Sequence, residues 1–194
     1  SNSQALTVTD CTFSTRNAQT LAVIKENLEV NGCSFFSCGN TEVNGGAIFW
    51  DSGQEKISRW DMLLGTKRIN VQYSKFIKCK SNLGGAIYSP KVESNITISN
   101  SEFDYCESLK INGSGKNIAI FSMGTRNRDI ICKSSFRDAS IYLGDVGSTS
   151  TSGEVYVQKT QFRNGDIYFR EMDSRYQIQN ECSFSEGSII KKSF

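Results

Sequence analysis

The segment ITISNSEF (96–103) alternates apolar and polar side chains before it ends on a phenylalanine, and versions of it recur along the whole chain. In six copies an isoleucine or valine stands five positions before the phenylalanine, and in the seventh it stands six positions before. Period-two alternation of β-branched residues is typical of strands and argues against a helical repeat. The copies are LTVTDCTF (6–13), LEVNGCSF (28–35), INVQYSKF (69–76), ITISNSEF (96–103), DIICKSSF (129–136), VYVQKTQF (155–162) and YQIQNECSF (176–184).

The distance between successive phenylalanines varies from 22 to 41 residues. A parallel β-helix tolerates this variation, because each coil fixes its strands and lets its turns bulge outward. A second apolar strand follows the phenylalanine, twice within a GGAI tetrapeptide (45–48 and 84–87). We therefore predict one all-β domain over residues 1–194, a single-stranded parallel β-helix of about seven to eight coils, with residues 49–68 and 107–128 projecting as loops. At roughly 4.8 Å per coil, the rod would be on the order of 35–40 Å long.

Small residues recur at two fixed positions of the repeat, and stacked coils would place each set in a column. Two positions before the phenylalanine lie Cys11, Cys33, Ser74, Ser101, Ser134, Thr160 and Cys182. Three positions after it, six of the seven residues are small, and the column is Arg16, Cys38, Cys79, Cys106, Ala139, Gly165 and Gly187. Such columns predict a phenylalanine ladder inside the rod with small polar side chains stacked beside it.

Composition excludes several kinds of chemistry. The 194 residues hold 22 Lys and Arg against 20 Asp and Glu, and a net charge of +2 gives no reason to expect nucleic acid as a partner. Histidine is absent, which removes Ser-His-Asp and Cys-His nucleophile sites and histidine-ligated zinc or haem. We expect no cofactor, and no membrane insertion, because no run of 18 apolar residues exists. Since the chain does not begin with Met, we expect it to be part of a longer polypeptide.

The seven cysteines leave two interpretations open. No CxxC motif occurs, so a metal site is not predicted. Stacked Cα atoms near 4.8 Å would fall inside the range for disulfides. Alternatively, the thiols form a ladder of small buried side chains. The residues concerned are Cys11, Cys33, Cys38, Cys79 and Cys106.

Surface sites are suggested by sequons and tryptophans. Asn95-Ile-Thr97 and Asn112-Gly-Ser114 are acceptor sequences for N-glycosylation, and Asn112 falls in a predicted loop. Trp50 and Trp60 lie at either end of the first predicted loop and could contact a ligand by stacking on sugar rings. Packing against the flank of the rod is the alternative for both.

Charged residues after the later phenylalanines raise the question of an enzyme. Arg137 and Arg163 both follow a phenylalanine directly, so stacking would make a small cationic stripe able to meet an anionic glycan. Carboxylate pairs flanked by arginines cleave polysaccharides in many β-helices. The candidates are Asp138, Asp145, Asp166, Glu171 and Asp173 with Arg170 nearby, but they form no compact group within one coil, and ordinary solvated charges are the alternative.

The two GGAI tetrapeptides and the three Phe-x-x-Cys motifs (35–38, 76–79 and 103–106) resemble the repeats of the chlamydial polymorphic membrane proteins and of similar surface proteins in some protists. That family alternates GGA(I/L/V) with Phe-x-x-Asn, where this chain has Cys in place of Asn. The resemblance is best over residues 28–106. It implies a right-handed parallel β-helix that works as a surface adhesin or autotransporter passenger.

The sequence as a whole favours a non-enzymatic module, secreted or at the cell surface, that acts as an adhesin or structural scaffold. Its expected partners are a protein or glycan at a cell surface, and either flanking coils of the same chain or subunits stacked end to end. One alternative is a pectate-lyase-like carbohydrate-active enzyme or glycan-binding module. A second alternative is the subunit of an extracellular filament that assembles end to end.

Overall fold

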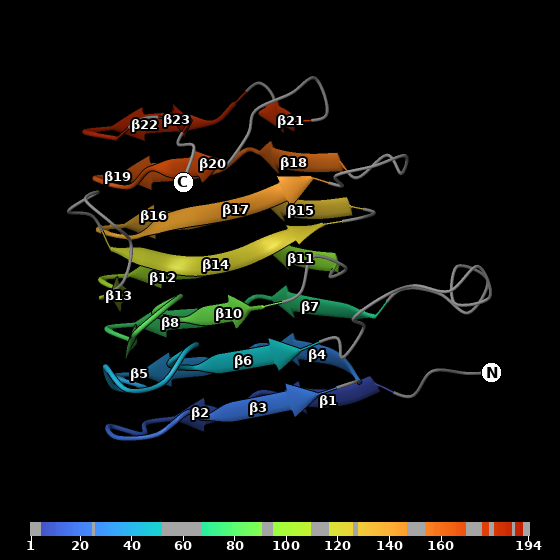
Figure 1. The fold of residues 1–194 in the computed structure, drawn as a ribbon, viewed down its shortest axis with the longest axis vertical. Coiled ribbons are helices and arrows are strands. Elements are labelled where there is room, and N and C mark those ends of the chain that lie inside the picture. Colours follow the sequence, from blue (N-terminus) through green and yellow to red (C-terminus); the bar gives the residue numbers. More distant parts are fainter. Residues whose placement is uncertain are drawn as a thin grey trace.

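A computed structural model describes residues 5–24, 26–51, 67–90, 95–109, 117–125, 128–146, 154–169, 176–178, 181–187 and 189–191. Within these ranges the chain contains strands and no helix, and the paired strands are parallel. The prediction of an all-β fold is therefore confirmed, and the stacked parallel strands are compatible with a solenoid (Figure 1).

Three sheets of seven strands each account for nearly all the described strands. Sheet A pairs, in order, β1 (Ala5–Thr9), β4 (Asn27–Asn31), β7 (Arg68–Gln72), β11 (Asn95–Ser99), β15 (Arg128–Cys132), β18 (Glu154–Gln158) and β21 (Tyr176–Ile178). Sheet B pairs β2 (Thr12–Phe13), β5 (Ser34–Phe36), β8 (Lys75–Ile77), β12 (Glu102–Asp104), β16 (Ser135–Arg137), β19 (Gln161–Arg163) and β22 (Ser183–Ser185). Sheet C pairs β3 (Leu21–Ile24), β6 (Ile48–Asp51), β10 (Ile87–Ser89), β14 (Ile118–Thr125), β17 (Ser140–Val146), β20 (Ile167–Phe169) and β23 (Ile189–Lys191). A two-stranded sheet joins β9 (Lys80–Ser81) to β13 (Glu107–Ser108).

The register of sheet A matches the repeat read from the sequence. Val30 pairs with Val8 on one side and Val71 on the other. The same column continues without a shift through the later copies and includes Ile178, although one extra residue separates Ile178 from its phenylalanine. The remaining members of the column are Ile98, Ile131 and Val157. The alignment of the seven copies is therefore the alignment that the sheets use.

The interior is filled by stacked rings and aliphatic side chains. The phenylalanines of sheet B form one ladder with centroids 4.7–5.0 Å apart and interplanar angles of 2–13°. The ladder runs through Phe13, Phe35, Phe76, Phe103, Phe136, Phe162 and Phe184. Isoleucines of sheet C, among them Ile48 and Ile87, are fully buried and belong to the same core.

From β5 onward, each short strand of sheet B lies between two left-handed residues. A positive φ occurs three positions before the phenylalanine, as at Asn100 (49°), and two positions after it, as at Tyr105 (52°). A single left-handed residue between extended segments turns the chain sharply, and outside glycine it costs roughly 1–2 kcal/mol. The residues in these corners have little in common, so the sequence analysis did not detect them. The corners before the phenylalanine are Asp10, Gly32, Tyr73, Asn100, Lys133, Lys159 and Glu181, and those after it are Ser37, Lys78, Tyr105, Asp138, Asn164 and Glu186.

The two predicted loops are shorter than expected. Residues 49–51 continue β6, and Arg68 begins β7, so only residues 52–66 fall outside the described ranges. In the second predicted loop, 107–108 form β13, 118–125 form β14 and Arg128 begins β15. The prediction of a projecting loop is wrong for these strand residues. Their apolar alternation, as in Ile118-Ala-Ile-Phe, fills sheet C where GGAI fills it in the two preceding strands.

Candidate functional site

The outer face of sheet B is the candidate site, because charged and polar side chains follow one another there over consecutive strands. The central phenylalanine of each strand points inward, so its two neighbours point outward. The outward residues before the phenylalanine are Thr12, Ser34, Lys75, Glu102, Ser135, Gln161 and Ser183. Those after it, from β5 onward, are Phe36, Ile77, Asp104, Arg137, Arg163 and Ser185.

Arg137 and Arg163 stand opposite each other on β16 and β19 but have different surroundings. The Nη2 of Arg137 donates a hydrogen bond to Oδ2 of Asp104, and its Cζ lies 5.5 Å from the centroid of the Tyr105 ring. The hydrogen bond that Arg137 donates to Asp104, and then the charge of Asp104, raise the pKa of Arg137. Arg163 is exposed and has no ion pair with any residue that the structure describes. The two arginines thus share a column, but only Arg163 presents an uncompensated charge.

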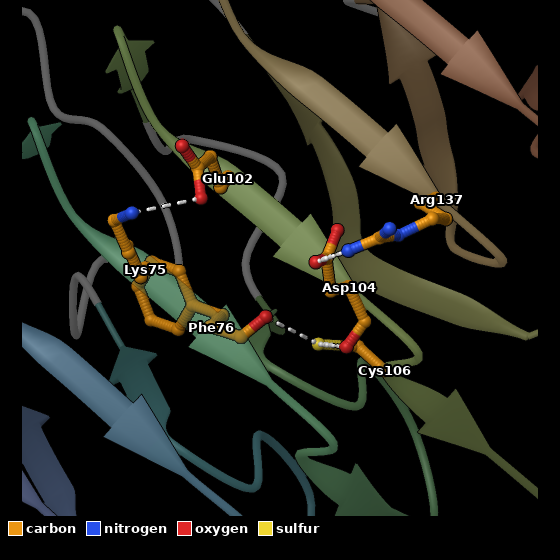
Figure 2. A network of polar contacts seen from close by, with 6 residues as sticks. All are labelled: Lys75, Phe76, Glu102, Asp104, Cys106 and Arg137. Atoms are coloured by element: carbon orange, nitrogen blue, oxygen red, sulfur yellow. Dashed lines mark hydrogen bonds and ion pairs between the residues drawn. The ribbon is translucent and has the colours of Figure 1, made fainter.

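Ion pairs link charged side chains of neighbouring repeats, and Figure 2 shows two of them on sheet B. Lys75 Nζ lies 3.2 Å from Glu102 Oε2, and Arg137 reaches Asp104, whose side chain is only 13% exposed. Similar pairs join Lys80 to Glu107 at 3.0 Å and Lys159 to Glu181 at 3.4 Å. Exposed pairs contribute about 0–1 kcal/mol each, so their main effect is to favour this register over a slipped one.

Two open depressions lie side by side on this face. The first, of about 390 Å³, extends across β12, β16, β19 and β22 and is lined by carboxylates, arginines, serines and Gln161. The second, of about 410 Å³, lies beside the corners that precede these strands, and Lys133 and Lys159 contribute to its wall. Both include Glu102, Ser135 and Gln161 in their lining. Together they make a shallow polar surface that extends along the stacking direction.

The first column of small residues forms a ladder of hydrogen bonds at the corner. The hydroxyl groups donate to the carbonyl oxygen two residues earlier, as from Ser101 Oγ to Ser99 O at 2.8 Å. They also accept from the neighbouring repeat, as from the Ser74 N–H to Ser101 Oγ at 3.2 Å. Cys33 donates to the carbonyls of Asn31 and Val8 in the same way, at 3.3 and 3.4 Å. Small side chains with an O–H or S–H donor therefore fit this column.

The second column brings three buried thiols together. Cys38, Cys79 and Cys106 are fully buried and donate to the carbonyl oxygens of Phe13, Phe35 and Phe76. All seven cysteines of the structure are free thiols. In the first repeat Thr15, not Arg16, occupies this position. The Gly39 N–H donates to the Thr15 carbonyl just as Lys80 N–H donates to that of Cys38.

The environment of Cys38 and Cys79 keeps these two thiols protonated. The hydrogen bond with Cys79, followed by desolvation, raises the pKa of Cys38. The hydrogen bond with Cys106 is the largest cause that raises the pKa of Cys79. Because the thiolate is the nucleophile, these groups react slowly in the folded chain.

We predict that a thiol reagent modifies the partly exposed cysteines of the native protein before it modifies the buried ones. The measurement is timed alkylation at pH 7 followed by peptide mass spectrometry, with the unfolded protein as the control in which all seven thiols react. Equal rates for the two groups would contradict the burial seen here. The partly exposed group is Cys11, Cys132 and Cys182, and the buried group is Cys33, Cys38, Cys79 and Cys106.

The tryptophan and sequon predictions have different outcomes. Trp50 is not a ligand-contact residue of a loop, because it lies on β6, is fully buried, and donates from Nε1 to the Glu26 carbonyl at 2.9 Å. Its inward direction follows from the alternation that begins at Ile48. Asn95 is the first residue of β11 and half-buried. Trp60 and Asn112 lie outside the described residues.

Of the carboxylates proposed for an enzyme, Asp138 and Asp166 have described side chains, and the two have different surroundings. Asp166 is fully buried and accepts a hydrogen bond from the Tyr168 hydroxyl at 2.9 Å. Asp138 accepts from the side-chain amide of Asn164 at a corner. Asp145 belongs to β17, and its side chain is not described. Arg170, Glu171 and Asp173 lie outside the described residues. The carboxylates that do border the depressions, Glu102 and Asp104, were not among the candidates, although aligning the repeats would have placed them beside Lys75 and Arg137.

Searches for other site types were limited to the described ranges. They hold no group of three or more Cys, Asp or Glu side chains arranged to bind a metal ion. They hold no helix with the length and apolar character needed to cross a membrane. Comparison of the chain with protein-family profiles, with curated proteins and with solved structures gave no match.

Proposed function

We propose that the chain is a single-stranded, right-handed parallel β-helix of seven to eight coils that serves as a non-enzymatic scaffold or adhesin, secreted or at the cell surface. The observation that carries the proposal is the continuous parallel pairing of seven strands in each of three sheets, with a register shift between Ile118 and Ile120 in sheet C. Such stacking makes a stiff rod, because each repeat is held by its neighbours through backbone hydrogen bonds and by continuous side-chain ladders.

The same stacking supports a binding role for the outer surface. Each outward position is repeated roughly every 4.8 Å along the rod, so a partner with a repeating structure can make the same contact several times. The polar face of sheet B, with its two depressions, is the described surface that best suits such contacts. A protein or glycan at a cell surface is the partner that this proposal expects.

Surface presentation can be tested on cells that produce the protein. Antibodies raised against the folded chain should label intact cells, and brief treatment of those cells with an external protease should remove the label. A cytoplasmic protein probed in parallel controls for leakage. Label that appears only after the cells are permeabilised would overturn the proposed location and the adhesive role with it.

A polysaccharide-cleaving enzyme is the alternative that one observation favours. The first depression, which crosses four strands of sheet B, is lined by Glu102, Asp104, Arg137 and Arg163. Such enzymes use these residue types for proton transfer and charge stabilisation. Both carboxylates are engaged by cations from adjacent strands, which supports binding over proton transfer. Incubation with acidic and neutral polysaccharides should therefore produce no new reducing or unsaturated ends, and their appearance would favour the enzyme.

A further inference from the structure

We infer that the outer face of sheet B, from β12 to β22, binds an acidic linear polysaccharide that lies along the stacking axis, with its anionic groups held by Arg163 and Lys133. This inference rests on the proposed function and names the ligand class of that module. It is carried by the shape of the face, by its charges and by its unpaired polar groups.

The shape of the face suits an extended chain. The two depressions adjoin along Glu102, Ser135 and Gln161. The first crosses four consecutive strands of sheet B, so its long direction follows the stack of repeats and not the strands themselves. Both are shallow and open, which fits a polymer that enters from the side better than a small molecule that must be enclosed.

The charges of the face leave a positive surplus. Six charged side chains border the two depressions, four of them cationic. Glu102 and Asp104 are already compensated by Lys75 and Arg137, and Lys159 pairs with Glu181. Arg163 and Lys133 face no carboxylate within ion-pair distance among the residues that the structure describes. Both are therefore available to a ligand anion, and a guanidinium pairs well with a carboxylate or a sulfate in a two-pronged geometry.

The neutral groups of the face suit a sugar chain. Ser135, Gln161, Ser183 and Ser185 line the first depression, and within the described part of the chain their side chains make no hydrogen bond. Hydroxyl and amide groups can donate and accept, as the hydroxyl groups of a polysaccharide require. Their recurrence on successive strands matches a ligand that repeats one chemical unit along its length. A nucleic acid fits less well, because the two phenylalanines that border the first depression, Phe136 and Phe162, are buried in the ladder and cannot stack on a base.

Two substitutions that the repeat itself supplies can remove the surplus charge without disturbing the fold. Arg163→Ser installs the residue that occupies the same register position at Ser185. Lys133→Asn installs the residue found at the equivalent left-handed corner, Asn100, where φ is also 49°. Lys78→Asn is the matched control, because Lys78 is an exposed cation at the opposite corner, outside both depressions, where Asn164 is the equivalent residue.

The test is calorimetric titration of the purified full chain with polymers of defined chemistry. Polygalacturonate offers carboxylates, dextran sulfate offers sulfates, and neutral dextran offers hydroxyl groups alone, so the arms identify which anion the face prefers. We expect binding to at least one acidic polymer and none to dextran, with affinity falling as salt is raised. In the Arg163→Ser, Lys133→Asn double variant we expect Kd to rise by about tenfold or more. Lys78→Asn should bind like the unsubstituted protein.

Several results would overturn the inference. They are equal binding of dextran, an unchanged Kd in the double variant, an equal loss in Lys78→Asn, or equally tight binding of a single-stranded oligonucleotide of similar charge. Far-ultraviolet circular dichroism of every variant establishes that the fold is retained. Because this titration uses purified protein, its failure leaves the surface-labelling experiment unaffected. Cleavage of a bound polymer would reject the non-enzymatic role while keeping the binding face.

Discussion

Replacing Phe103 with alanine is expected to lower the free energy of unfolding by about 3–5 kcal/mol, as for other buried phenylalanines. The ring is fully buried in the middle of the ladder. Its centroid lies 4.7 Å from that of Phe76 and 4.8 Å from that of Phe136, with interplanar angles of 3° on both sides. Truncation therefore removes two stacked contacts and leaves a cavity that the sheets around it cannot close without breaking register. Urea unfolding followed by circular dichroism measures the change.

Phe36→Ala is the matched control for this prediction. Phe36 belongs to the same sheet and directly follows a ladder member, but its side chain points outward and is 37% exposed. Its loss should change the free energy of unfolding by no more than about 0.5 kcal/mol, the usual range for a surface substitution. If the two variants lose similar stability, the phenylalanine ladder does not hold the repeats together in the way its burial implies.

The sequence was sufficient to predict the register because similar residues recur at the same position in successive repeats. Val30 and Phe35 illustrate this: both pair in the sheets with the residues that alignment of the copies places beside them. Stacked strands select for like residues, since one misplaced side chain would leave a cavity or a clash in the neighbouring repeat. Fold class and most column positions therefore follow from the sequence alone, the exception being Arg16, whose expected place is taken by Thr15.

The corners of the chain were not predictable from residue type. Asp10, Tyr73 and Lys133 occupy the equivalent corner in three different repeats, and all three have a φ between 49° and 51°. Gly32 carries the usual signal for a left-handed residue, and Asp10 and Asn100 tolerate that region, but tyrosine and lysine at the same corner give no such signal. The hydrogen bonds that neighbouring repeats form around the turn offset the free-energy cost of the left-handed conformation. The constant offset from the phenylalanine is the signal that remains, and it becomes visible only after the repeats are aligned.

The candidate face was only partly predictable. Alignment places Arg137 beside Arg163, which suggested a cationic stripe, but it equally places Asp104 beside Arg137. Reading one pair of repeats at a time missed the carboxylate that neutralises the first arginine. Trp50 is a second example. The prediction of a loop after Ile48 overlooked the alternation of buried and exposed residues that places the Trp50 indole in the core.

Gly46→Ala is the second substitution expected to have a large effect, a loss of about 3 kcal/mol at the upper end of the range for overpacking. A Cβ at this position would lie 2.5 Å from the Gly85 carbonyl oxygen and 2.7 Å from those of Cys38 and Lys80. All three are backbone atoms, and two of them accept hydrogen bonds from neighbouring repeats, the Gly85 carbonyl from Gly46 N–H and the Cys38 carbonyl from Lys80 N–H. The added methyl group must therefore push neighbouring repeats apart. Thermal unfolding and urea unfolding of the variant measure the effect.

Gly32→Asn separates this crowding from the general effect of losing a glycine. Gly32 has a φ of 63°, but the equivalent corner accepts Asn100, and the nearest obstacle to a Cβ is the movable side chain of Asp10. We expect a change within about 1 kcal/mol, because asparagine tolerates the left-handed region and the carboxylate can move aside. A large loss of stability in Gly32→Asn with none in Gly46→Ala would mean that the backbone conformation of the corner limits stability. It would also mean that Gly46, the second glycine of GGAI, is not needed for close contact between repeats. The opposite result assigns that glycine to the contact that sets the spacing of successive strands in sheet C.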